Sequence, residues 1–142
     1  MKERIVCQRI VAQTRNHIKI IASYDSGKNL NVDTVINIIP KTKDFNVKYL
    51  LAILNSKFAS YYLYNFVYNR AVRSMNFEYS KYLPIKNTHL SEQNKIAKMV
   101  EELLISSSQG KDIKEMEKNL DNKIYEIYGL SKIEIETIEN LE

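Results

Sequence analysis

Nine arginine, lysine, asparagine and serine side chains lie in segments of the sequence without regular helical or strand spacing. They are Arg15, Asn16, Lys28, Asn29, Asn69, Arg70, Arg73, Ser74 and Asn76. Arginine and lysine can hold phosphate oxygens, whereas arginine and asparagine can also make paired hydrogen bonds to the edges of guanine and adenine. The same residue types are common in ordinary solvated loops, so this pattern alone leaves both interpretations open.

The charged residues are distributed unevenly along the 142-residue chain, whose formal net charge is +4. Residues 1–90 contain 14 lysines and arginines against 5 acidic residues, whereas residues 91–142 contain 7 against 12. Nucleotide bias can enrich a sequence in isoleucine, asparagine and lysine, but it does not reverse the sign of the charge between two halves. A basic N-terminal part is typical of proteins that bind a polyanion such as a nucleic acid.

The sequence lacks the residue constellations that catalysis or cofactor binding requires. Its two histidines and one cysteine are not spaced as metal ligands, and its three glycines are isolated. Pro40 and Pro84 lie too far apart for the Asn/Asp-Pro-Pro-Tyr/Phe motif of amino-group DNA methyltransferases. The few acidic residues of the basic part do not suggest a nuclease-like metal cluster. We therefore expect no catalytic centre, no cofactor and no metal, which argues against a degenerate nuclease.

The distribution of apolar residues predicts a cytoplasmic protein without membrane contact. No apolar run approaches the ~20 residues of a membrane-spanning helix, and the N-terminus lacks the apolar stretch of a signal peptide. The single cysteine, Cys7, lies in a strand-like run and is expected to be a buried small hydrophobic residue.

The N-terminal part has the spacing and composition of antiparallel strands. Residues 4–14, 18–24 and 34–39 are dense in β-branched residues, and a turn-forming segment around Gly27 separates the second run from the third. Residues 83–85 read as a short edge strand, because Pro84 cannot donate a hydrogen bond to a neighbouring strand.

Helical spacing begins after Asn46 and dominates the C-terminal part. An apolar stripe predicts a long helix over residues 47–68, capped by Asn46. Residues 91–142 are expected to be entirely helical, with Ser91 as a first cap and a Ser131–Glu134 capping box near the end. The fold class predicted is α+β: an antiparallel β-rich domain with a long packed helix over residues 1–90, followed by a helical segment over residues 91–142.

Four short pieces of sequence follow one another in a characteristic order. Residues 5–10 read Ile-Val-Cys-Gln-Arg-Ile, and residues 49–58 read Tyr-Leu-Leu-Ala-Ile-Leu-Asn-Ser-Lys-Phe. Residues 82–85 (Tyr-Leu-Pro-Ile) precede Ser-Glu-Gln-Asn-Lys-Ile at 91–96, and residues 120–130 read Leu-Asp-Asn-Lys-Ile-Tyr-Glu-Ile-Tyr-Gly-Leu. In this order and spacing they resemble the C-terminal specificity domain of TaqI-like and type IIG restriction-modification enzymes. The third piece also resembles the end of a recognition domain in type I specificity subunits.

This resemblance covers residues 4–142 and carries several implications. It implies a target recognition domain whose loops enter the grooves of double-stranded DNA, packed on helices that act as a spacer or join two copies in a homodimer. It also implies a DNA methyltransferase, often fused to a nuclease, as the partner. Family members commonly carry a glycine in the loop before the Leu-Pro-Ile strand, whereas residues 70–74 contain none. Contact residues of that loop are therefore not transferred from the family.

Two hypotheses from different classes follow from these observations. In the first, the chain is a sequence-specific duplex DNA recognition module that positions a partner methyltransferase or nuclease. In the second, it is a helical protein–protein assembly module of the same kind of complex, without base-specific readout. Residues 91–142 are then the functional part.

Overall fold

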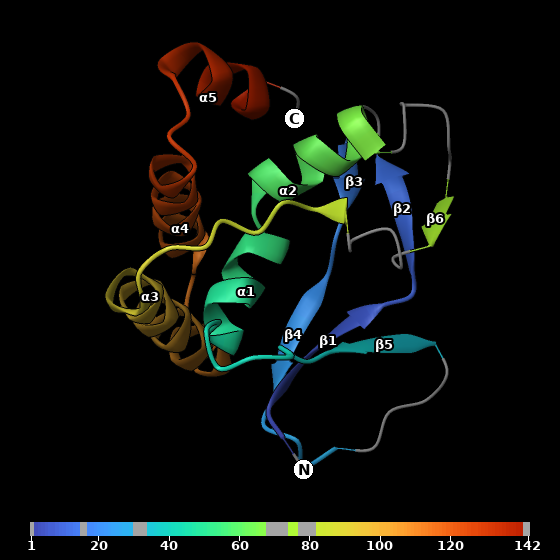
Figure 1. Cartoon of the computed structure of the whole chain (residues 1–142), viewed down its shortest axis with the longest axis vertical. Coiled ribbons are helices and arrows are strands. Elements are labelled where there is room, and N and C mark those ends of the chain that lie inside the picture. The colour runs from blue at the N-terminus through green and yellow to red at the C-terminus, as the bar shows by residue number, and fades with distance from the viewer. Residues whose placement is uncertain (1, 15–16, 30–33, 68–73, 77–81, 141–142) are drawn as a thin grey trace.

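Most of the helices lie on one side of the molecule and the strands on the other (Figure 1). The computed structural model describes residues 2–14, 17–29, 34–67, 74–76 and 82–140. Its strands are β1 (Arg4–Gln8), β2 (Ile10–Thr14), β3 (His17–Lys19), β4 (Ala22–Asp25), β5 (Val35–Ile38) and β6 (Ser74–Asn76). Within the described residues they form two three-stranded antiparallel sheets, with β1 between β4 and β5 and with β2 between β3 and β6. The predicted α+β class with antiparallel strands is confirmed.

The first two β-rich runs form one bent ribbon rather than two uninterrupted strands. In the first sheet Cys7 lies opposite Ala22, and in the second sheet Ala12 lies opposite Lys19. Between these pairs one strand advances by five residues and the other by three, so the first strand accommodates two extra residues around Arg9. A bulge of this kind increases the local twist and bends the strand. The ribbon therefore divides into two sheets.

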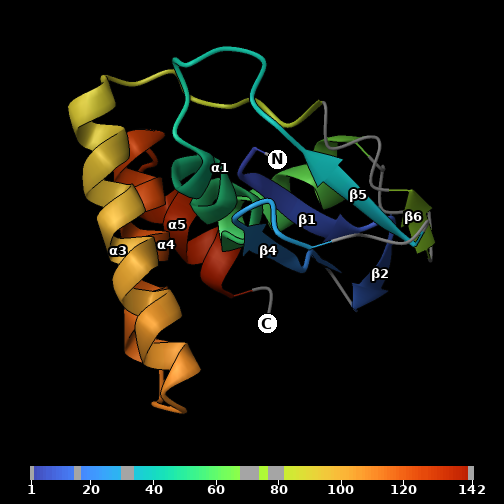
Figure 2. The ribbon, with the colours of Figure 1, turned by 90° about the horizontal axis from the view of Figure 1, so that it is seen from below.

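The helices form two layers, and the inner layer contacts the strands. They are α1 (Val47–Leu54), α2 (Lys57–Tyr62), the π-helical turn η1 (Leu63–Val67), α3 (Leu90–Ser108), α4 (Lys114–Ile127) and α5 (Lys132–Glu139). Figure 2 shows the sheets on one side of the molecule, α3 and α4 on the other, and α1 between them. Contacts of α1 with β1 and β4 on one side and with α3 on the other agree with this arrangement. The described C-terminal part is helical, as predicted.

The helix predicted over residues 47–68 is interrupted at Asn55 and Ser56. The hydroxyl of Ser56 donates a hydrogen bond to the carbonyl of Ile53 at 2.6 Å and accepts one from the N–H of Ala59 at 3.1 Å. A serine side chain can compete in this way with the backbone bonds of a continuous helix. Ser56 therefore becomes the N-cap of α2, while the apolar stripe continues across the break and conceals it in the sequence.

One hydrophobic core joins the two parts of the chain. Ile5 and Cys7 of β1 are buried in the same cluster as Ile53 of α1, Ile96 of α3 and Ile124 of α4. Full burial of an aliphatic side chain of this size contributes about 1.5–3 kcal/mol. Cys7 is 1% exposed, which confirms its predicted place in the core. The helices of residues 91–142 thus complete the core on which the strands pack.

The ends of the C-terminal helices follow local sequence signals, with one shift. Ser131 and Glu134 form the predicted capping box of α5. Gly129, just beyond α4, has φ of 64°, a left-handed conformation that glycine adopts without strain. The helix α3 begins before Ser91, because the ring nitrogen Nδ1 of His89 accepts a hydrogen bond from the N–H of Ser91 and makes His89 the N-cap.

The prediction of an edge strand at residues 83–85 is wrong, because this segment is not a strand and pairs with none of the strands in the described part of the chain. Instead, the hydroxyl of Tyr128 donates to the carbonyl of Pro84 at 2.6 Å and accepts from the N–H of Lys86 at 3.0 Å. One tyrosine side chain satisfies backbone groups that a neighbouring strand could have paired. The segment is consequently tied to the end of α4 rather than to a sheet.

Candidate nucleic-acid interface

The nine candidate contact residues fall at two places in the structure and partly outside it. Five of them lie outside the described residues: Arg15, Asn16, Asn69, Arg70 and Arg73. The remaining four are Lys28 and Asn29, which follow β4, and Ser74 and Asn76, which belong to β6.

The turn after β4 is organised by the carboxylate of Asp25, which is only 5% exposed. Asp25 accepts hydrogen bonds from the N–H of Gly27 and from Asn29 Nδ2, both at 3.1 Å, and from Arg4 Nε at 2.8 Å. Burial acts to raise the pKa of Asp25, but the hydrogen bonds from Arg4 and Gly27 outweigh it and leave the pKa below its ordinary value. The amide of Asn29 therefore supports the turn, whereas Lys28 extends into solvent.

The second sheet places Lys19 and Ser74 at the same level on either side of β2. Both lie opposite Ala12, Lys19 from β3 and Ser74 from β6. Asn76 lies opposite the first residue of β2, which directly follows Arg9. Arg9 and Lys19 are therefore close in register to Ser74 and Asn76. Neither cation is among the nine candidates predicted from the sequence. Their strand-like context concealed them, and the sequence offers one signal: Gln8 and Arg9 interrupt the apolar run of residues 5–12.

Lys28 and Asn29 lie at the opposite end of β1 from the second sheet. Asn29 accepts a hydrogen bond at its carbonyl from Arg4, the first residue of β1, whereas Arg9 follows the last. A strand rises by about 3.3 Å per residue, so the two ends of β1 are about 13 Å apart. Figure 1 shows β6 well away from the lower end of β4. The described candidates are therefore spread along the strand side rather than gathered in one cluster.

Ion pairs neutralise two lysines of the basic part that lie beside the acidic helices. Lys48 Nζ is 2.6 Å from Glu101 of α3, and Lys57 Nζ is 2.8 Å from Glu139 of α5. Exposed cations that no ion pair engages within the described residues include Arg9, Lys19 and Lys28. Glu101 and Glu139, two acidic residues of the C-terminal part, are thus paired with lysines of the basic part. Arg9, Lys19 and Lys28 all lie in the strands or directly beside them.

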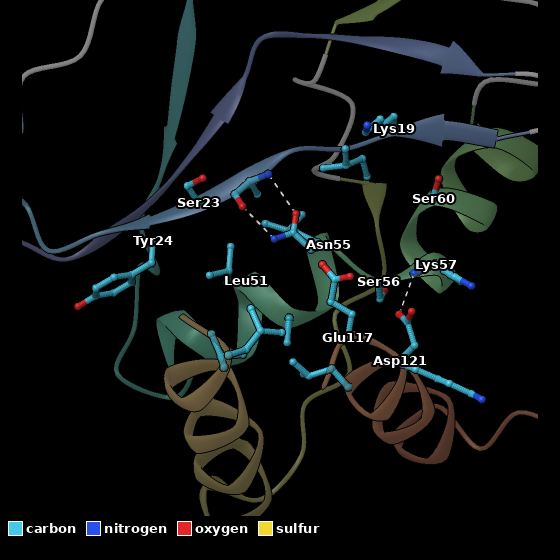
Figure 3. Close-up of a pocket in the computed structure, with 18 of the residues that line it drawn as sticks. Lys19, Ser23, Tyr24, Leu51, Asn55, Ser56, Lys57, Ser60, Glu117 and Asp121 are labelled. Carbon is cyan, nitrogen blue, oxygen red and sulfur yellow. Dashed lines mark hydrogen bonds between the residues drawn. The ribbon is translucent and has the colours of Figure 1, made fainter. Parts of the chain in front are cut away.

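A groove of about 970 Å³ separates the edge formed by β3 and β4 from α3 and α4 (Figure 3). Asn55 reaches from the end of α1 to β4, where Nδ2 donates to the carbonyl of Ala22 at 2.9 Å and Oδ1 accepts from its N–H at 3.0 Å. On the helix side, Asp121 accepts from the N–H of Lys57 at 3.0 Å. The three consecutive residues 55–57 thus attach the strand edge, cap α2 and hold α4.

Two titratable groups, the buried thiol of Cys7 and the half-buried carboxyl of Asp121, have raised pKa values because burial disfavours their charged forms. Burial raises the pKa of the Cys7 thiol to about 12, so the thiol stays protonated near neutral pH. Burial also raises the pKa of Asp121 to about 6, against the opposing hydrogen bond from Lys57.

Among the described residues, no group of three or more His, Cys, Asp or Glu side chains could hold a metal ion. No helix of the described part is both long and apolar enough to cross a bilayer.

In a comparison with protein families, the chain matches a class of specificity domains that serve target recognition in restriction-modification systems. The chain belongs to the family of TaqI-like C-terminal specificity domains, whose model matches residues 1–85. Specificity domains of this family are generally non-catalytic. The match spans all described strands and ends before α3. No curated protein and no solved structure matched the chain.

Proposed function

We propose that this chain is the sequence-specific duplex DNA recognition module of a restriction-modification system and positions a partner DNA methyltransferase, often one fused to a nuclease, on its target. The observation that carries the proposal is the family match over residues 1–85. The charge supports it, because residues 1–90 contain 14 basic residues against 5 acidic ones. Such a surface attracts the phosphate backbone of DNA.

Binding divides into contacts that position the protein and contacts that read the sequence. Hydrogen bonds and ion pairs to phosphates set the register on the duplex, whereas side chains that reach base edges provide specificity. The residues that we propose to contact DNA are Arg15, Asn16, Lys28, Asn29, Asn69, Arg70, Arg73, Ser74 and Asn76. Lys28 suits a phosphate contact because it is exposed and is engaged in no ion pair within the described residues.

Arg70 and Arg73 are proposed to read bases. They belong to the segment that connects η1 with β6, and Leu63 in η1 is fully buried. A connection anchored in packed elements can hold a guanidinium in a DNA groove at modest entropic cost. Arginine can also make two parallel hydrogen bonds to O6 and N7 of guanine, the commonest specific contact in the major groove.

The test compares Arg70→Ala and Arg73→Ala with the matched control Lys118→Ala, which removes the same charge from α4. Each duplex affinity is measured on the cognate and on a scrambled sequence, with the methyltransferase partner present. Loss of a bidentate guanine contact should cost about 1–3 kcal/mol on the cognate duplex only. Equal losses from all three substitutions would place the DNA on a different face and would contradict the proposal.

The proposed division of labour assigns the chemistry to the partner. The chain binds DNA without a catalytic centre or a cofactor of its own, and the complex acts in the cytoplasm. In this scheme residues 1–90 form the recognition domain, and residues 91–142 form a spacer that also joins two copies of the chain.

A second candidate function is a helical assembly module without base-specific readout. The observation that favours it is the exposure of two isoleucines in the helices, Ile105 of α3 at 57% and Ile133 of α5 at 76%. An exposed apolar side chain on a helix is a candidate for a contact with another chain. Light scattering and duplex affinities of the wild-type chain and of Ile105→Ser test this function. A dimer that is lost in the variant, together with equal wild-type affinity for the cognate and the scrambled duplex, would support it over the first function.

A further inference from the structure

We infer that Arg9 and Lys19 form a phosphate-binding site at the bend of the β-ribbon, which holds the DNA backbone close in register to Ser74 and Asn76 of β6. This inference rests on the proposed DNA recognition function and adds two positioning residues to it. Neither residue belongs to a turn or a loop of the predicted pattern. The pairing of the strands places Lys19 opposite Ala12, three residues after Arg9, and the side chain of Gln8, which precedes Arg9, bonds to the carbonyl of Lys19.

Arg9 lies between β1 and β2, where the first strand of the ribbon accommodates its two extra residues. Its backbone is fixed, because the N–H of Arg9 donates to the carbonyl of Thr34 at 3.2 Å. A bulge takes a side chain out of the regular alternation of the strand and redirects it. The exposed side chain of Arg9 is therefore presented from a well-held backbone.

Lys19 is the last residue of β3, on the second strand of the same ribbon. The preceding residue, Ile18, is 1% exposed, and its carbonyl accepts a hydrogen bond from Ser60 of α2. Because side chains alternate along a strand, Lys19 points away from the face that buries Ile18. It is exposed and is one of the residues that line the groove of Figure 3. Across the ribbon, Gln8 Nε2 donates to the carbonyl of Lys19 at 3.2 Å and holds this end of β3 beside the bulge.

The chemistry of the pair fits phosphodiester oxygens. Arginine presents a planar fork of donors that matches two phosphate oxygens, and lysine supplies a compact positive charge. Within the described residues, no carboxylate forms an ion pair with Arg9 or Lys19. By register they are neighbours of Ser74 and Asn76, which belong to the proposed contact surface. A backbone contact here sets the orientation of the duplex and does not discriminate between sequences.

The experiment uses the full chain and two short fluorescent duplexes of unrelated sequence. The variants are Arg9→Ala, Lys19→Ala and the double variant, with Lys98→Ala as the control because Lys98 is an exposed lysine on α3. Dissociation constants are measured by fluorescence anisotropy between about 50 and about 200 mM salt.

One phosphate contact contributes a slope of about 0.9 to the dependence of log affinity on log salt, or about eightfold in affinity at about 0.1 M salt. On both duplexes, each single variant should show a slope smaller by about 0.9 and an affinity about eightfold lower. In the double variant the slope should decrease by about twice as much, and the affinity should be about 60-fold lower. Lys98→Ala should match the wild type. The charge-preserving double variant Arg9→Lys with Lys19→Arg should keep the wild-type slope, and the melting temperatures of all variants should stay unchanged.

Three results overturn the inference in distinguishable ways. If wild-type binding depends steeply on salt but Arg9→Ala and Lys19→Ala behave like Lys98→Ala, the phosphate site is wrong and the proposed function stands. If a variant loses affinity on one duplex only, with an unchanged slope, the residue reads bases instead. If the wild-type chain shows no salt-dependent binding to either duplex, the proposed function fails and the site fails with it.

Discussion

The Asn55→Asp substitution should destabilise the fold at neutral pH and should recover much of that stability in acid. In the native protein the side-chain amide of Asn55 makes two hydrogen bonds with the backbone of Ala22 at the edge of β4, at 2.9 and 3.0 Å. An aspartate of the same shape keeps the acceptor for the N–H of Ala22. It replaces the donor, however, by a charged oxygen that faces the carbonyl of Ala22.

The magnitude follows from this geometry. A lost hydrogen bond between neutral groups costs about 0.5–1.5 kcal/mol, and an uncompensated contact between two acceptors adds to it. Asn55 is exposed, so water reduces the repulsion. We expect a loss of about 1–2 kcal/mol in the free energy of unfolding at pH 7. Asn55→Ala removes both bonds and should cost a similar amount, but at every pH.

The pH dependence distinguishes the two variants. A protonated carboxyl group regains a donor and can restore the bond to the carbonyl of Ala22, so the pKa of the new carboxyl is higher in the folded than in the unfolded state. Because the pKa of this carboxyl is raised in the folded state, the stabilisation by the restored hydrogen bond is fully present below the unfolded-state pKa of about 3.9. It is lost as the pH rises through the folded-state pKa. The deficit of Asn55→Asp should therefore be small below about pH 4 and complete at pH 7.

Urea unfolding followed by circular dichroism at a series of pH values measures these differences. The control is Asn122→Asp, because Asn122 is exposed on α4 and the substitution makes the same change of charge. The reasoning is refuted if Asn55→Asp is no less stable than Asn122→Asp at pH 7. It is also refuted if the deficit of Asn55→Ala changes with pH in the same way as that of Asn55→Asp.

Three further predictions concern the N-cap of α2, the half-buried carboxyl of Asp121 and the absence of catalytic activity. Ser56→Ala removes the N-cap of α2 and should lower the free energy of unfolding by about 1 kcal/mol in urea titrations, whereas an unchanged midpoint would contradict the capping role. Asp121→Asn keeps an acceptor for the N–H of Lys57 but removes a carboxyl whose pKa burial raises to about 6. Because ionisation of that carboxyl opposes folding above its folded-state pKa, the variant should be more stable than the wild type by about 1–2 kcal/mol at pH 8, and the gain should vanish below about pH 4. A loss of stability at pH 8 would refute this sign. The pure chain, incubated with duplex DNA, S-adenosylmethionine and magnesium, should neither methylate nor cleave; cleavage that copurifies with the chain and is abolished by a chelator would overturn this expectation.

Several features of the fold could be predicted from the sequence because they depend on neighbouring residues. The capping box at Ser131 and Glu134 requires only two residues three apart, and Gly129 marks the end of α4 by its own backbone freedom. The β-branched runs predict antiparallel strands, and the place of Cys7 in a strand-like apolar run predicts its burial. The helical character of the C-terminal part follows in the same way from apolar spacing. The sequence also predicts nine candidate contact residues, five of which lie outside the described residues.

Other features depend on partners far along the chain, and only the tertiary structure decides them. The bulge at Arg9 results from the different registers of two strand pairs, and no local pattern encodes a register. Tyr128 occupies the backbone groups of Pro84 and Lys86 that an edge strand would have used, across more than 40 residues of sequence. Asn55 reads as one more helical position until Ala22 is seen opposite its amide. Local propensity selects the type of element, whereas long-range hydrogen bonding and burial decide where it ends and which side chains it brings together.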